Sequence, residues 1–215
     1  ENLTMLLKTM LFFFVITIFA SACYFFLTSF LQRKSFRFTL ITFLLSLAIY
    51  VSLFFVRPVS VYLSDTFMLF SAASFCVLIG RGVKTVPSIV SFSIAGSIAD
   101  IVSFNWGPTH YFMKAAEQLN PASLLNLMAF SIVLKGSICP IVGLGDFIFI
   151  GIYFIALRQI GAGSWAQFII PTAGLLGALI VGVLVGGIYA IPFMAAVVIG
   201  YLFFSHRLSP RAQPC

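Results

Sequence analysis

Long apolar runs, separated by short polar or basic connections, dominate this sequence. They cover residues 5–31, 38–56, 67–80, 87–106, 138–157, 167–187 and 188–204. Most are close to the ~20 residues that a helix needs to cross a bilayer. They are too long for the strands of a membrane barrel, which have about ten residues. The pattern therefore predicts an all-α, polytopic membrane protein with about seven transmembrane helices and short loops.

The runs fall into two groups. Residues 1–86 hold about three predicted N-terminal helices, and residues 87–215 hold a helical core and a basic tail. The apolar run at 11–31 is longer than the core of a signal peptide, so we expect a membrane helix there. The apolar stretch 124–134 is too short to span, and we expect it at the membrane interface or as a re-entrant segment.

Composition supports a membrane location. The chain has 215 residues, of which 61% are hydrophobic and only 8% charged, whereas soluble domains carry roughly 25% charged residues. The net charge of +7 comes from basic residues between apolar runs, which indicates a lipid bilayer as the partner and no nucleic acid. Two basic clusters, at 33–37 and 81–84, give a consistent alternation if both are cytoplasmic, with the N-terminus outside. We thus expect an integral, multi-pass protein.

Acidic residues are rare, and two of them lie inside apolar runs. The chain has five acids, and Asp100 and Asp146 fall within predicted spans, whereas Glu1, Asp65 and Glu117 are expected at a terminus or in loops. Placing an ionisable side chain in hydrocarbon costs free energy, so such a residue is interpreted first as a functional one. These two aspartates are the candidate functional residues of the chain.

The surroundings of Asp100 predict an inward-facing stripe on one helix. Ser93, Gly96, Ser97, Asp100 and Ser103 recur at spacings of three and four, which places them on one helical face. A small-residue packing stripe is the structural alternative. That alternative accounts for the serines and the glycine but gives no reason for an acid.

Two glycines frame the second aspartate, in the order Gly143, Leu144, Gly145, Asp146. Glycine has no Cβ, so the backbone there can unwind or approach another chain closely. Water and an extended substrate backbone would then reach the acid. The structural alternative is a helix–helix contact that happens to include an acid.

A pair of buried carboxyl groups suits acid–base catalysis. Two carboxyls close together in a low-dielectric site do not both ionise cheaply, so they share one proton. The charged member takes a proton from water, and the protonated member donates to the carbonyl oxygen of an amide. This chemistry needs neither a metal nor another cofactor, and the cysteines and histidines show no metal-binding spacing.

Residues 142–149, Val-Gly-Leu-Gly-Asp-Phe-Ile-Phe, resemble the GxGD signature of the presenilin and signal peptide peptidase family of intramembrane aspartyl proteases. The continuation at 151–158 is closer to the signal peptide peptidase branch. Ala99 stands where the family has a tyrosine before its first aspartate. The resemblance implies that Asp100 and Asp146 are catalytic, with Gly143, Leu144 and Gly145 forming the active-site backbone.

The family also has a Pro-Ala-Leu motif on its last helix, which helps bind substrate. Its best match is Ile191, Pro192 and Phe193, where only the proline is shared. The resemblance covers roughly residues 87–204. It implies an aspartic endopeptidase that cleaves transmembrane helices or signal-peptide remnants.

Two other functions stay open. A transporter or channel would use one buried aspartate as a proton or cation site. A prepilin-peptidase-like enzyme would also carry GxGD, but that family usually follows it with a basic residue, whereas residues 147–149 are apolar.

Overall fold

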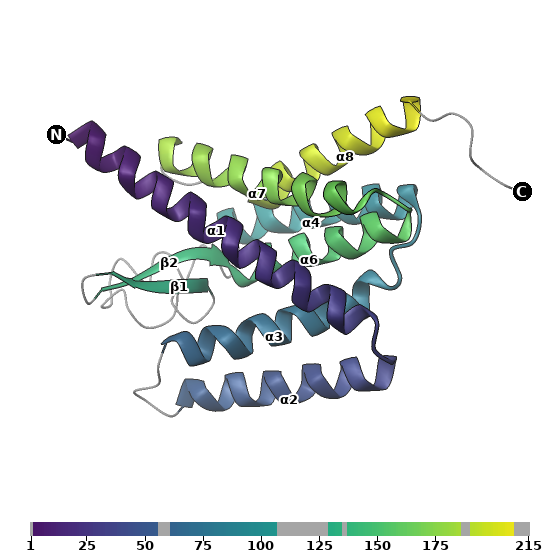
Figure 1. The fold of residues 1–215 in the computed structure, drawn as a ribbon, viewed down its shortest axis with the longest axis horizontal. Helices are drawn as coiled ribbons and strands as arrows, with labels where there is room; N and C mark the ends of the chain where they lie inside the picture. Colours follow the sequence, from purple (N-terminus) through teal and green to yellow (C-terminus); the bar gives the residue numbers. More distant parts are fainter. Residues whose placement is uncertain (1, 56–60, 107–128, 135–136, 186–189, 209–215) are drawn as a thin grey trace, which may run out of the picture.

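A computed structural model describes residues 2–55, 61–106, 129–134, 137–185 and 190–208. This part of the chain forms seven helices and one two-stranded ribbon (Figure 1). In chain order these elements are α1 (Asn2–Gln32), α2 (Phe36–Phe55), α3 (Val61–Gly80), α4 (Val86–Trp106), β1 (Ala129–Leu134), β2 (Ser137–Gly143), α6 (Leu144–Gln159), α7 (Ser164–Val185) and α8 (Ala190–Leu208).

Five of the helices are long and apolar enough to cross a membrane, namely α1, α2, α3, α4 and α7. The other two are shorter in their apolar part: α6 has 16 residues, or about 24 Å at 1.5 Å per residue, against a hydrocarbon core of about 30 Å. Large apolar side chains are exposed along α1, α2 and α4, among them Leu11, Phe19, Ile41, Leu45 and Ile98. A water-soluble protein rarely exposes so much apolar surface, which indicates a membrane protein.

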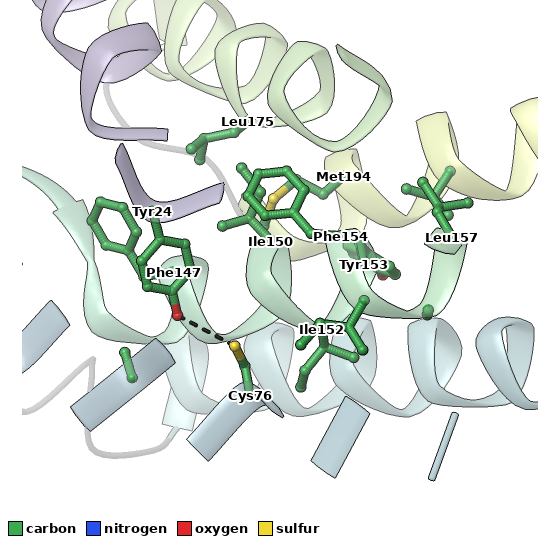
Figure 2. Close-up of a cluster of buried hydrophobic side chains, with 14 of the residues drawn as sticks. Tyr24, Cys76, Phe147, Ile150, Ile152, Tyr153, Phe154, Leu157, Leu175 and Met194 are labelled. Carbon is green, nitrogen blue, oxygen red and sulfur yellow. Dashed lines mark hydrogen bonds between the residues drawn. The ribbon is translucent and has the colours of Figure 1, made fainter. Parts of the chain in front are cut away.

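Helix α6 lies at the centre of the bundle. It packs against α1, α3, α7 and α8, and its residues from Ile150 to Leu157 are all buried. Figure 2 shows its side chains directed toward several neighbouring helices at once. A helix that is apolar on all sides is expected in such a core position. Because α6 carries Asp146, the second candidate acid is held by the best-packed element.

Close packing of α6 against α1 and α3 depends on Gly151. A Cβ at this position would lie 2.5 Å from the sulfur of Cys76 and 2.8 Å from the ring of Tyr24, so no larger residue fits. The Tyr24 hydroxyl donates to the Cys76 sulfur at 3.6 Å, drawn dashed in Figure 2. This bond satisfies a polar group that would otherwise be buried alone.

The prediction of one helix over 138–157 is wrong in its first third. Residues Ser137–Gly143 form strand β2, which pairs antiparallel with β1 from Leu134↔Ser137 to Ala129↔Gly143, and the helix begins only at Leu144. Proline at 140 and the β-branched residues at 138, 141 and 142 favour extended backbone over a helix. Residues 129–134 of the short apolar stretch form β1, and residues 124–128 lie outside the described part.

Asp65 is not in a loop, contrary to the prediction. Helix α3 begins at Val61, six residues earlier than expected, and Asp65 lies in its second turn with only 4% of its surface exposed. A negative charge near a helix N-terminus is favoured by the helix dipole. Its carboxyl also acts electrostatically on Tyr50 of α2. The polar connection predicted around His110 and Glu117 lies outside the described residues.

Candidate active site between α4, α6 and α8

Helices α4 and α6 meet at a glycine. A Cβ on Gly96 would overlap the ring of Phe149, so this ring of α6 reaches the backbone of α4 only because residue 96 has no side chain. The Phe149 ring also stacks on Phe92, with centroids 4.9 Å apart. One turn further along α6, the Tyr153 hydroxyl donates to the Ser93 hydroxyl oxygen at 2.9 Å. Together with the packing of α4 against α8, these contacts set the rotation of α4 about its axis.

That rotation turns the predicted polar stripe of α4 inward. Ser93 and Gly96 are buried, and Ser97, Asp100 and Ser103 are half-buried. The isoleucines on the opposite face, at 94, 98 and 101, are exposed. The prediction that the small and polar face of this helix points into the bundle is confirmed.

Asp146 is the third residue of α6, and Gly143 is the residue that precedes the helix. Gly143 has an extended backbone, with φ −68° and ψ 152°, and its N–H donates to Oδ2 of Asp146 at 3.1 Å. A Cβ on Gly143 would lie 3.1 Å from the same oxygen, whereas a Cβ on Gly145 would meet no atom within 4 Å. Gly143 thus leaves room for the carboxylate, and Gly145 borders open space beside it.

Asp100 accepts a hydrogen bond from α8. The backbone N–H of Ile191 donates to its Oδ2 at 3.3 Å, in the first turn of that helix. Ile191 is buried, while Pro192 and Phe193 are half-buried. The structure therefore brings the predicted substrate-binding segment beside the first aspartate, although 91 positions separate the two bonded residues.

The two aspartates are electrostatic neighbours. The charge of Asp100 acts on the Asp146 carboxyl, and both residues are half-buried. Asp146 lies twelve residues from Arg158 on α6, and Asp100 lies fourteen from Val86 on α4. At 1.5 Å per residue these separations are about 18 Å and about 21 Å, deep inside a bilayer if the opposite helix ends lie at its surface.

Each aspartate also has a structural interpretation. An acid in the first turn stabilises a helix by accepting from backbone N–H groups and by facing the positive end of the dipole. Asp146 accepts from the N–H of Gly143 at the start of its own helix. Asp100, although it lies on α4, accepts from the N–H of Ile191 in the first turn of α8. Capping explains each acid separately, but it does not explain why two acids lie within electrostatic range of each other in an apolar bundle.

Sequence reasoning did not find the contacts that hold this site together. Neither the fit of Phe149 against Gly96 nor the Tyr153–Ser93 bond was predicted. The tyrosine was a usable signal, because a buried hydroxyl within an apolar run requires a partner. Among the described residues, no group of three or more His, Cys, Asp or Glu side chains is placed to hold a metal ion.

Comparison of this chain with known protein families, with curated proteins and with solved structures finds no match. The assignment of function therefore depends on the site itself.

Proposed function

We propose that this protein is an intramembrane aspartic endopeptidase that hydrolyses peptide bonds in transmembrane helices or signal-peptide remnants. The observation that carries the proposal is that Asp100 and Asp146 lie near enough for their charges to interact, on two helices that touch where the Phe149 ring lies against Gly96. A multi-pass arrangement and a cytoplasmic position for the basic helix ends belong to the same proposal.

The reaction follows from one proton shared by two carboxyl groups. The ionised aspartate takes a proton from water as the water oxygen attacks the amide carbon. The protonated aspartate gives its proton to the carbonyl oxygen, which forms a tetrahedral diol. Collapse of the diol breaks the C–N bond: the proton taken from water passes to the departing amine, and one diol hydroxyl returns its proton to the aspartate that had protonated the carbonyl oxygen, which leaves a carboxylic acid product. The N–H groups of Gly143 and Ile191 hold the carboxyl oxygens in position.

The ribbon β1–β2 offers a way to present a substrate. A helix hides its peptide bonds, so a transmembrane substrate has to become extended before cleavage. Strand β2 ends at Gly143, directly before the helix that carries Asp146. An extended peptide can pair with the edge of such a ribbon through main-chain hydrogen bonds, which would place its backbone next to the acid.

The test is cleavage of a labelled transmembrane peptide by purified protein in detergent or lipid discs. Wild type is compared with Asp100→Asn and Asp146→Asn, and with Asp65→Asn as a matched acid outside the site. Cleavage should be lost in the first two variants and kept in the third. It should also be blocked by a peptide whose scissile amide is replaced by a hydroxyl-bearing mimic of the diol.

Cleavage that persists in either Asp100→Asn or Asp146→Asn would remove that residue from the mechanism. If the peptide stays intact while ion flux into liposomes depends on one aspartate, the protein is a transporter or channel instead.

A further inference from the structure

The opposite end of the bundle from β1 and β2 contains a second polar feature. The connections α1–α2, α3–α4 and α6–α7 all lie at this end (Figure 1), and Arg81 links the first two by donating to the carbonyl oxygen of Lys34 at 2.6 Å. We call this end of the bundle the basic end, since it carries Arg33, Lys34, Arg37, Arg81, Lys84 and Arg158. A pocket of about 510 Å³ opens here between α1, α6 and α7.

Arg158 forms the inner wall of this pocket and is held rigidly by neutral partners. Its guanidinium donates to the side-chain oxygens of Gln167 at 3.0 Å, Gln32 at 2.9 Å and Ser29 at 2.6 Å. The ring of Phe25 lies 5.5 Å from its central carbon. All these groups are uncharged, so they fix the guanidinium without neutralising it.

Positive charge accumulates in the same pocket from two further sources. Arg33 lines it, and its charge repels that of Arg158. Ser164, the first residue of α7, also lines it, so the positive end of that helix lies at the pocket. The described lining includes no acidic residue. Two arginines, one of them partly buried, and a helix N-terminus thus share one pocket whose described lining has no acidic side chain.

We infer that this pocket binds the phosphate of an anionic phospholipid headgroup. A phosphate offers several charged oxygens, which bind two guanidinium groups at once and remove their mutual repulsion. Backbone N–H groups at a helix N-terminus bind phosphate in the same way. Basic pockets between membrane helices are established binding sites for anionic headgroups.

The rim of the pocket favours a lipid over a soluble phosphate compound. Phe26, which lines it, is 71% exposed, and Trp165, next to Ser164, is 78% exposed. Tryptophan is enriched at the membrane–water interface, and an exposed phenylalanine offers apolar surface to lipid. An acyl chain extending from a bound headgroup would therefore lie along apolar side chains, whereas a soluble phosphate would leave them uncovered.

The test measures binding of a fluorescent short-chain phosphatidylglycerol to the purified full chain in a neutral detergent. Arg33→Gln and Arg158→Gln should each weaken binding at least about tenfold, the loss expected for a charge-assisted hydrogen-bonded pair. Lys84→Gln, which removes an equal charge from the same end but outside the pocket, should leave binding unchanged. Unlabelled phosphatidylglycerol should compete far better than phosphatidylcholine or glycerol phosphate.

Thermal unfolding separates lost binding from lost structure. Arg158→Gln breaks three hydrogen bonds and is expected to lower stability, but Arg33 is exposed and its replacement leaves those bonds in place. Wild-type affinity in Arg33→Gln, or an equal loss in Lys84→Gln, would overturn the proposal. Equal competition by glycerol phosphate would show that the pocket binds a soluble phosphate compound and has no preference for a lipid. Because the pocket does not depend on proteolysis, Asp100→Asn and Asp146→Asn should bind the lipid as wild type does.

Discussion

Adding one methyl group at Gly96 should separate the two carboxyl groups that we propose to be catalytic. Carbon atoms pack at about 3.5–4.0 Å, and a Cβ on Gly96 would overlap the Phe149 ring. Phe92 stacks on that ring and Tyr153 lies beside it, so the ring has little room to turn away, and we expect α4 to move by about 1 Å. A misplacement of about 1 Å costs roughly 100-fold in rate. We therefore expect Gly96→Ala to lower kcat/KM for a labelled transmembrane peptide by about that factor.

Stability should change much less than activity. Overpacking costs about 1–3 kcal/mol, but alanine is favoured over glycine inside a helix by about 1 kcal/mol, so the net loss is about 0–2 kcal/mol. Phe149→Leu removes the ring atoms in the way and should restore most of the activity of Gly96→Ala. Gly200→Ala is the matched control, because a Cβ there meets no atom within 4 Å. Wild-type activity in Gly96→Ala, or an equal loss in Gly200→Ala, would refute the reasoning.

Three further changes test the contacts around the site and at the basic end. Gly143→Ala places a Cβ 3.1 Å from the Asp146 carboxylate. The carboxylate must shift by a few tenths of an ångström, which weakens its hydrogen bond from the N–H of residue 143, and kcat/KM should fall about tenfold; unchanged peptide cleavage would contradict this. Tyr153→Phe removes the 2.9 Å bond to Ser93 and should lower the free energy of unfolding by about 1 kcal/mol, and a Ser93→Ala change added to it should cost little more. Arg81→Ala removes the donor to two carbonyl oxygens at the end of α1 and should lower the unfolding temperature without affecting peptide cleavage.

Helix periodicity was informative for α4 and misleading for α6. The stripe from Ser93 to Asp100 was placed correctly, because spacings of three and four identify one face of a long helix regardless of its neighbours. The run at 138–157 predicts one helix, since periodicity does not separate a short buried strand from a buried helix. The proline at position 140 was the signal that favoured a strand. Asp65 was misplaced because a charged side chain near a helix start resembles a loop residue in sequence.

The amino-acid sequence by itself determined that this is a membrane protein, which face of α4 is polar, and which acids lie in apolar surroundings. These properties depend on how each side chain interacts with water or lipid, and that preference belongs to the residue and its near neighbours in the chain. Tertiary structure alone decided that Gly96 fits against Phe149 and that Asp100 bonds to Ile191, 91 positions away. Such contacts depend on the volumes of side chains from separate helices packed at solid-like density, which no local pattern encodes.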